Sequence, residues 1–504
     1  MRKNARFLPN PLRLAKLIFS IMCMYQLAVN RLRLCFMTIA LAGVLYTAVA
    51  ESASWTVSPS VSASETYMDN VTLTSTPPKE TEWITQINPG ISLQGTGKEL
   101  NLALNYRLQN LLYLNEPKRN NSYQQLRASA NATIQPQLLF LDANTSLSQQ
   151  VLSASDKVGV GNVGVVQNRS DVRSTRVSPY LRTRIANSFL TELRYTYDNI
   201  SYSGSSVLDN SSNSSSIFLT PSKRGARFTW RLNWEHRETS YKGRADERRE
   251  NAALNLSYQV DPKVGVVGIF GYENNKYSST RPDLSGNYWN LSATWQPSRR
   301  TAFSVNAGER FFGDTKGFSF SRQGRRSSVR VSYSEDISTR RQLQLKVLEV
   351  PVFDANGNPV IDINTGSQLL DDVELLVSFD QVFLLRKASA SFGYRTKKTT
   401  ADVTLFAEKR AFEDISFEDK IKGSTVRMTW TMSRKSSITA SATRRTTERL
   451  SSDDVYQVYF ASIRRRLFTN ANTSLDIRHL QRDGDSTNNS YKVNTITANF
   501  RVSW

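Results

Sequence analysis

The sequence predicts an all-β protein that folds as a transmembrane, antiparallel, up-and-down β-barrel. Three features predict this fold. Segments of about ten residues alternate apolar with polar side chains, short and long polar connections alternate between the segments, and the last segment ends on an aromatic residue, Trp504. A tilted strand of about 9–11 residues is long enough to cross a bilayer. In a membrane barrel one face of each strand meets lipid and the other meets a polar lumen, which produces such alternation.

Composition excludes two other classes of protein. Of the 504 residues, 39% are hydrophobic and 10% are aromatic, and the mean hydropathy is −0.43. Such a chain is too polar for a bundle of membrane-spanning helices, because each of these needs about 20 mostly apolar residues. It is also too aromatic, and too regular in its alternation, for a disordered chain.

Residues 1–50 are predicted to be a signal peptide, and residues 51–504 are predicted to form the barrel. The apolar stretch Leu34–Ala50 ends on Ala-Val-Ala, a small-x-small pattern that is typical of a cleavage site. An earlier apolar stretch, Leu17–Val29, is either part of an extension of residues 1–30 from a mis-assigned start codon or a retained helical anchor. The leader holds both cysteines and seven basic residues, which leaves a formal charge of +14, out of +21, on residues 51–504.

Alternation assigns an outer and an inner face to each predicted strand. Between Glu99 and Leu112, one face holds Leu100, Leu102, Leu104, Tyr106 and Leu108, and the other holds Asn101, Asn105, Arg107 and Gln109. A period of two places each set on one side of a strand. A soluble β-sandwich would alternate in the same way, but its strands are usually about 5–6 residues long. The length of the segments therefore favours a membrane barrel.

Connections between the segments orient the barrel and predict the number of strands. Outer-membrane barrels have short periplasmic turns and longer external loops. Counting the two kinds of connection gives about 22 strands, in a predicted range of 18 to 22, with an even number and both termini on the periplasmic side. The predicted short turns are Gly95–Lys98, Gln135–Gln137, Ala186–Ser188, Pro221–Gly225, Asp261–Lys263, Gln296–Arg300, Glu335–Thr339, Thr396–Thr399, Ser433–Ser436 and Phe468–Asn470. The predicted long loops include Ser153–Asp171, Ser203–Ser212, Ser278–Ser285 and Phe353–Gln368.

The last segment, Tyr491–Trp504, predicts both the compartment and the route of assembly. Its apolar residues, among them Phe500 and Trp504, alternate toward the outer face, and the aromatic Trp504 stands last. This arrangement is similar to the carboxyl-terminal signal that barrel-assembly machinery recognises. We therefore expect the protein in the outer membrane, with Phe500 and Trp504 as its assembly signal.

Three segments resemble one family of proteins. They are Trp55–Val71, the stretch from Ile84 to Leu114, and Pro351–Asp362, which contains the run Asp-Ala-Asn-Gly-Asn-Pro. Together they resemble the outer-membrane proteins associated with PEP-CTERM/exosortase systems, which are encoded among exopolysaccharide biosynthesis genes of Gram-negative bacteria. The likeness extends over essentially all of residues 51–504. It implies a context of exopolysaccharide assembly and export, and it offers no catalytic residues to carry over.

The inner faces of the predicted strands hold more basic than acidic residues. Because Arg or Lys facing lipid at the bilayer midplane costs about 2–4 kcal/mol, the basic excess is expected in the lumen, in loops or at the interfaces. The candidate basic lumen consists of Arg107, Arg182, Arg184, Arg194, Arg227, Arg231, Arg310, Arg330, Arg427, Arg478 and Arg501, with Lys346 and Arg395 on the same faces. The acidic residues on these faces are Glu99, Glu192, Asp198, Glu235, Asp402, Glu408 and Asp476.

These charges allow two interpretations. A basic lumen attracts anions, and arginine forks suit carboxylates, so the barrel could conduct an anionic polymer or solute. Alternatively, luminal Arg and Glu pair across strands to brace the wall, while external basic residues bind lipopolysaccharide phosphates. The leading hypothesis is a channel of an exopolysaccharide system. Its rival is a non-conducting structural or anchoring barrel of the export complex or the cell surface.

Other kinds of site are not predicted. Asp354–Asp362 has the oxygen-rich composition of a Ca²⁺ loop, but it lacks the closing glutamate and is also ordinary turn chemistry. The two histidines, His236 and His479, lie far apart in the sequence, and no His/Ser/acid constellation suggests an enzyme. No cofactor or metal is predicted. The basic residues are too dispersed for a nucleic-acid site, so the expected partners are outer-membrane lipid and lipopolysaccharide, the assembly machinery, exopolysaccharide and periplasmic export proteins.

Overall fold

A computed structural model describes residues 54–504 apart from 153–155, 167, 187, 205–206, 223–224, 340, 343–381, 416, 450–452 and 486–489. The predicted signal peptide, Lys346 and the candidate Ca²⁺ loop Asp354–Asp362 lie outside the described residues. No helix in the described part of the chain is both long and apolar enough to cross a membrane.

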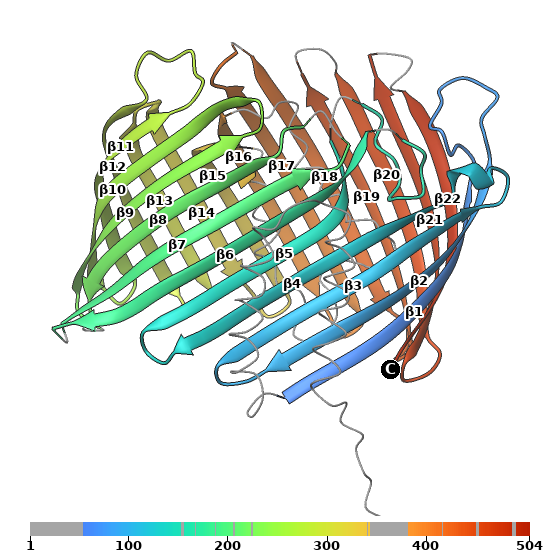
Figure 1. The fold of residues 1–504 in the computed structure, drawn as a ribbon, viewed down its shortest axis with the longest axis horizontal. Coiled ribbons are helices and arrows are strands. Elements are labelled where there is room, and N and C mark those ends of the chain that lie inside the picture. The colour runs from blue at the N-terminus through green and yellow to red at the C-terminus, as the bar shows by residue number, and fades with distance from the viewer. Residues whose placement is uncertain are drawn as a thin grey trace, which may run out of the picture.

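Twenty-two antiparallel strands form one closed barrel, as predicted (Figure 1). The strands are β1 (Ser54–Met68), β2 (Glu82–Thr96), β3 (Leu100–Tyr113), β4 (Asn121–Gln135), β5 (Leu139–Val151), β6 (Arg169–Ile185), β7 (Phe189–Tyr202), β8 (Asn210–Pro221), β9 (Phe228–Tyr241), β10 (Arg244–Asp261), β11 (Val264–Lys276), β12 (Ser285–Ser298), β13 (Thr301–Arg310), β14 (Gly313–Gln323), β15 (Ser327–Thr339), β16 (Val382–Arg395), β17 (Thr399–Phe412), β18 (Glu418–Thr431), β19 (Ser436–Glu448), β20 (Asp454–Arg466), β21 (Ala471–Gly484) and β22 (Tyr491–Ser503). Each strand pairs with the next along the chain, so the topology is up-and-down.

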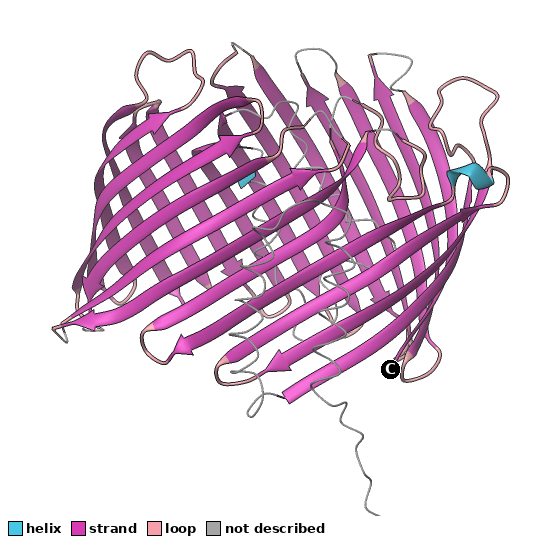
Figure 2. Cartoon of the chain, viewed as in Figure 1, coloured by secondary structure: helices cyan, strands magenta, loops and turns pink. Residues whose placement is uncertain are grey.

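The barrel closes where the first strand pairs with the last. The register runs from Ser60 opposite Ser503 to Met68 opposite Thr495, and the backbone N–H of Trp504 donates to the carbonyl of Pro59 at 3.0 Å. Closure leaves no unpaired strand edge, as a lipid environment requires. Strands account for almost all of the regular structure, and the short 3₁₀ helix Pro117–Arg119 lies in the loop between β3 and β4 (Figure 2).

Connections at the two ends of the barrel differ in length. The ten turns at the end where β1 starts contain between two and six residues, so this end is assigned to the periplasm. Most connections at the other end are longer, although β9–β10 and β13–β14 are joined there by only two residues each, Lys242-Gly243 and Phe311-Phe312. The loops at the external end therefore differ widely in length.

One predicted turn is wrong. Residues Glu335–Thr339 continue β15 and stay in register with β16, and the true periplasmic turn is Gly324–Arg326. At the external end this strand packs against neighbouring connections: Ile337 lies in a buried cluster with Tyr277 and Phe312, and Ser338 and Thr339 are buried as well. A polar run there does not mark a turn, because its side chains lie within a paired strand and are partly buried against other parts of the barrel.

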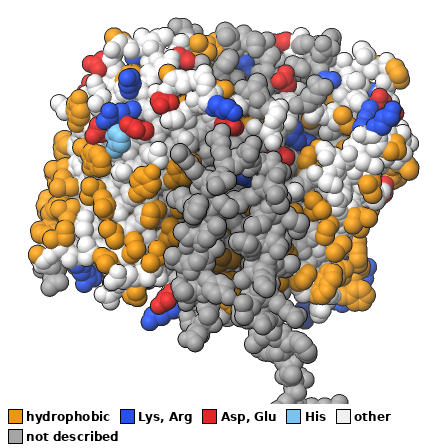
Figure 3. Space-filling view, viewed as in Figure 1, with side chains coloured by type: hydrophobic (Ala, Val, Ile, Leu, Met, Phe, Trp, Pro, Cys, Tyr) orange, Lys and Arg blue, Asp and Glu red, His pale blue; other side chains and the backbone are white. Residues whose placement is uncertain are grey.

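Large apolar side chains form a belt on the outer face. Residues that lie opposite each other on neighbouring strands share the outer face and are exposed, as are Phe270 with Trp289 and Ile477 with Ile496. Figure 3 shows hydrophobic side chains over the lower part of this face and charged side chains nearer the upper rim. Each large side chain of such a belt gains about 1.5–3 kcal/mol when lipid replaces water. A closed barrel with an apolar belt is suited to span a membrane, and the protein is placed in the outer membrane.

Aromatic rings flank the belt. Near the periplasmic end, Phe303 packs between Trp295 at 5.3 Å and Phe320 at 4.7 Å between ring centroids. Near the external end, Tyr67 and Trp83 lie 5.2 Å apart. Such rings are the girdles that position a barrel at both membrane interfaces.

Candidate functional site in the barrel interior

The interior wall of strands β12 to β16 is lined mainly by small polar side chains. Ser304, Asn306, Ser319 and Ser332 occupy luminal positions there, and the hydroxyl of Ser332 lies 2.9 Å from that of Ser389 on the next strand. Small hydroxyl and amide groups project little from the wall. They also offer hydrogen bonds without adding charge.

Ten of the eleven candidate arginines occupy luminal positions. Their strand neighbours on either side point outward, as Val426 and Met428 do on either side of Arg427. Arg227 instead lies in the periplasmic turn before β9. The luminal arginines are Arg107, Arg182, Arg184, Arg194, Arg231, Arg310, Arg330, Arg427, Arg478 and Arg501.

Three of these arginines form ion pairs across strands. Arg194 contacts Asp142 at 2.8 Å and Glu192 at 2.9 Å, and Glu192 also accepts from Arg182 at 2.5 Å. The Arg194 guanidinium stacks on the ring of Tyr180, 3.8 Å from its centroid. Arg310 likewise contacts Glu273 and Asp336, each at 2.7 Å. These networks connect neighbouring strands and brace the wall.

Two luminal networks were not singled out from the sequence. Arg176 contacts Asp198 at 2.6 Å, and Lys387 contacts Glu408 at 2.8 Å. Both basic residues point toward the lumen, because they alternate with outward-facing neighbours on their strands. The same alternation in the sequence could have identified them. Asp198 also lies 3.8 Å from Arg341, which belongs to the loop after β15. Burial lowers the pKa of the Arg341 guanidinium, and Asp198 opposes that shift.

A second group of luminal arginines has no acidic partner in the part of the chain that the structure describes. Among the described residues, no carboxylate forms an ion pair with Arg184, Arg330 or Arg427, although Asp402 is opposite Arg427 in the strand register. Arg231 stacks over Phe218 at 5.0 Å and likewise pairs with no described acid. All four lie in the periplasmic half of the barrel, since each is close to the periplasmic end of its strand.

The periplasmic turns add to this positive charge. Within their described residues the only acid is Glu99. A count of charges in the predicted turns would have revealed this asymmetry, which the search for luminal residues overlooked. The basic residues of these turns are Lys98, Arg227, Lys263, Arg299, Arg300, Arg325, Arg326, Lys397, Lys398, Arg434 and Lys435.

At the external end, the loop between β5 and β6 folds into the lumen. Its Val160 and Val163 pack against inward-facing side chains of distant strands, including Tyr456 and Tyr491. Polar contacts hold its backbone: Tyr491 donates to the carbonyl of Val158 at 2.7 Å, and Tyr113 donates to that of Val163 at 3.0 Å. The loop therefore occupies part of the external mouth and is attached to strands from both ends of the chain.

Asn162 anchors the middle of this loop. Its buried amide donates to the side-chain oxygens of Gln109 at 2.7 Å and Gln149 at 3.2 Å.

Changing Asn162 to alanine should weaken loop docking by about 1–3 kcal/mol, because two buried acceptors lose a donor. We expect faster tryptic cleavage after Lys157 in the same loop, measured on the detergent-solubilised protein. Asn306→Ala, on the luminal wall of β13, is the matched control and should leave cleavage unchanged; equal rates for both variants would contradict the anchoring role.

A buried charge cluster lies beside the same loop. The carboxylate of Asp454 accepts from Arg449 and, at 3.1 Å, from Arg482, and Arg482 also donates to the backbone carbonyl of Asp156. Arg445 lies in the same buried group. The cluster thus links the ends of β19, β20 and β21 to the inward-folded loop.

The described residues contain no group of three or more His, Cys, Asp or Glu side chains that could hold a metal ion. His236 and His479 both lie on the outward phase of their strands, and the Nδ1 of His479 is 2.7 Å from the side-chain oxygen of Asn494.

No protein-family model and no curated protein matches the sequence. Solved structures do match the fold. The siderophore receptor PirA from Acinetobacter baumannii gives a TM-score of 0.53 at 7% identity, covering 89% of this chain and 80% of that one. A mutant of the ferric enterobactin receptor PfeA from Pseudomonas aeruginosa gives 0.52 at 8% identity, covering 90% and 81%. The FrpB iron transporter from Neisseria meningitidis gives 0.51 at 9% identity, covering 92% and 83%. At these identities the likeness concerns the fold: this chain has the barrel architecture of outer-membrane receptors and transporters.

Proposed function

We propose that the protein is an outer-membrane channel for an anionic polymer or solute of an exopolysaccharide system. The observation that supports this function best is the set of luminal arginines without an acidic partner among the described residues, Arg184, Arg330 and Arg427. A guanidinium that is already paired offers little to a passing anion, whereas an uncompensated one attracts carboxylates and can bind them through two hydrogen bonds.

The two ends of the barrel suggest the direction of passage. The periplasmic end combines short turns with a basic rim, so it raises the local concentration of anions. The external mouth is narrowed by the inward-folded loop between β5 and β6. A polymer that enters from the periplasm therefore meets the attractive end first. The resemblance to proteins of exosortase-associated exopolysaccharide loci supports the same direction, toward export.

Conductance through planar bilayers tests this function. The purified protein should pass current with a preference for anions, measured as the reversal potential in a salt gradient. Changing both Arg330 and Arg427 to glutamine should lower that preference by about twofold or more, since the field in the lumen falls with each charge removed. Arg322→Gln is the control, because Arg322 lies on the outward phase of β14 and its charge faces away from the lumen.

A non-conducting structural barrel is the second candidate. The braced networks around Arg194 and Arg310 and the inward-folded loop favour it, because they stabilise the wall without forming a path for ions. If neither the wild-type protein nor the Asn162→Ala variant conducts, the channel is excluded and this candidate stands. A clear cation preference would also contradict the basic lumen.

A further inference from the structure

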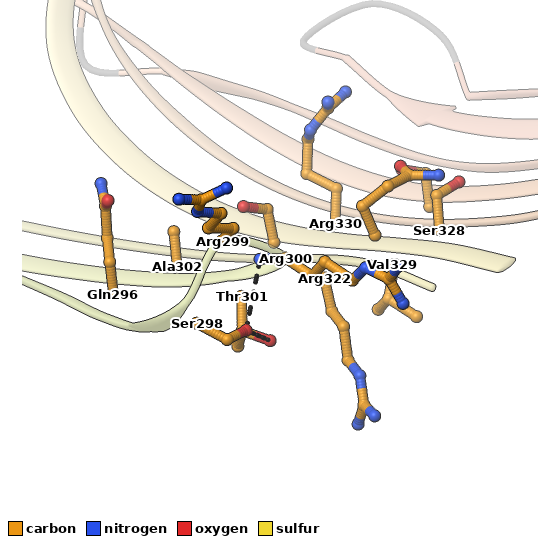
Figure 4. Close-up of a pocket in the computed structure, with 13 residues that line it drawn as sticks. Gln296, Ser298, Arg299, Arg300, Thr301, Ala302, Arg322, Ser328, Val329 and Arg330 are labelled. Atoms are coloured by element: carbon orange, nitrogen blue, oxygen red, sulfur yellow. Dashed lines mark hydrogen bonds between the residues drawn. The ribbon is translucent and has the colours of Figure 1, made fainter. Parts of the chain in front are cut away.

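A pocket of about 370 Å³ lies at the periplasmic end of the wall, between the β12–β13 turn and strands β14 and β15 (Figure 4). It lies where the small polar wall meets the basic rim. A volume in this range is typical of sites for small ligands. Its lining includes four arginines, Arg299, Arg300, Arg322 and Arg330, together with Gln296, Ser328 and Ser391.

The charge of this pocket is positive and uncompensated. No Asp or Glu lines it, and among the described residues Arg299, Arg300 and Arg330 pair with no carboxylate. Like charges gathered in one pocket repel one another, and each guanidinium retains donors that nothing in the described chain satisfies. An anion bound among them would relieve the repulsion and accept those hydrogen bonds.

The guanidiniums that matter face the lumen. Figure 4 shows Gln296, Arg299 and Arg330 extending to one side of the strands and Arg322 extending to the opposite side. The strand register explains this arrangement. Arg330 is opposite Ser321 and Ser391, which share its luminal phase, whereas Arg322 is opposite Val329 on the outward phase. The lining therefore includes both faces of the wall: Arg299 and Arg330 extend toward the interior, and Arg322 extends outward.

Neutral donors and acceptors surround the charged groups. The hydroxyls of Ser328 and Ser391 and the amide of Gln296 line the pocket. Such groups suit a ligand that carries several hydroxyls beside its charge, because each ligand hydroxyl both donates and accepts. A ligand with this chemistry is an anionic, polyhydroxylated group, which could be an acidic sugar or a phospholipid headgroup.

We propose that this pocket binds a carboxylated sugar unit of an anionic glycan that enters from the periplasm. The inference rests on the proposed function and names its substrate class. The sugar carboxylate would accept from Arg299 and Arg330, and the ring hydroxyls would bond to the serines and Gln296. A phospholipid headgroup is the less suitable occupant, because it would approach from the side of Arg322 and the pocket's other arginines face away from lipid.

Binding of trigalacturonate to the full-length protein in detergent, measured by isothermal titration calorimetry, tests the proposal. Wild-type protein should bind it and should not detectably bind neutral maltotriose. The double variant Arg299→Gln, Arg330→Gln should raise the Kd about tenfold or more, equivalent to about 1.4 kcal/mol. The matched control Arg434→Gln should leave the Kd unchanged, because it removes a rim charge outside the pocket. Arg322→Gln tests whether the outward-facing guanidinium of the pocket lining takes part in binding. Heat-modifiable migration on gels checks that every variant is folded.

Three results would overturn the proposal. The first is no trigalacturonate binding by the wild-type protein. The second is an equal loss in Arg434→Gln, which would reduce the effect to general attraction by the rim. The third is a loss in Arg322→Gln together with competition by nanodiscs containing phosphatidylglycerol, which would assign the pocket to a lipid headgroup. Conductance measured on the same preparations separates the two ideas, because binding without current contradicts only the proposed function, and current without binding contradicts only this pocket.

Discussion

Replacing Asp454 with alanine should destabilise the barrel by about 3–5 kcal/mol, the cost typical of removing one partner from a buried ion pair. The carboxylate is buried at the external end of β20, and it accepts hydrogen bonds from Arg449 and Arg482. Arg445 is also buried in this group. Without Asp454, these guanidiniums would stay desolvated and would repel one another.

Urea unfolding followed by tryptophan fluorescence in detergent measures this effect. Glu448→Ala is the matched control. The Glu448 carboxylate is half-exposed at the end of the adjacent strand β19 and lies 3.7 Å from Lys420. An exposed ion pair of this kind contributes only about 0–1 kcal/mol to stability. Changing Arg482 to methionine in the Asp454→Ala background should recover part of the loss, because one uncompensated charge is removed. If Asp454→Ala costs no more than Glu448→Ala, the cluster is not a stabilising element.

Changing both Phe500 and Trp504 to alanine should lower the amount of folded protein in the outer membrane by about tenfold, well beyond the loss in a control pair that gives up the same kind of lipid contact. Both side chains are on the outer face, and Trp504 is 64% exposed, so few contacts within the protein are lost. The lipid contact that these side chains give up costs about the same for any large outer-face side chain, so a control pair on that face measures its contribution. A large loss in cells would therefore point to recognition during assembly, which is the role that the sequence predicts for these residues.

Quantitative blotting of outer-membrane fractions, compared with refolding yield in detergent, separates the two effects. The control pair is Phe392→Ala with Trp430→Ala, two exposed aromatic residues on the outer faces of β16 and β18. The control should lose the same kind of lipid contact and keep normal amounts in the membrane. Equal losses in both double variants would show that lipid contact, rather than an assembly signal, explains the result.

Much of the fold could be predicted from local patterns. Alternation with a period of two identifies which face of a strand a residue occupies, as it does for Arg330 and Arg427, because side-chain direction depends on backbone conformation alone. Turn residues such as those at 396–398 mark hairpins for the same local reason. The pattern failed at Glu335–Thr339, where polar residues continue β15 in register with β16 and are partly buried by contacts that the local sequence does not show.

The partners of the luminal charges could not be predicted in this way. Arg194 meets Asp142 although 52 residues separate them, and Arg427 forms no ion pair with Asp402 although the register places them opposite each other. Ion pairing depends on the strand register and on side-chain conformers, which a single strand's sequence does not contain. The pocket beside Arg330 likewise depends on tertiary structure, because the β12–β13 turn and strands β14 to β16 contribute to its lining.

By itself, the sequence determined the strand-and-turn architecture, the even number of strands, the apolar outer face and the basic character of the interior. These properties follow from side-chain alternation and turn chemistry within a few residues. Only the tertiary structure decided which arginines are braced and which remain open to a ligand. It also decided that the loop between β5 and β6 folds inward onto strands near both chain ends. The physical reason is that these contacts join residues far apart in the chain, so they exist only after the barrel closes and its register is set.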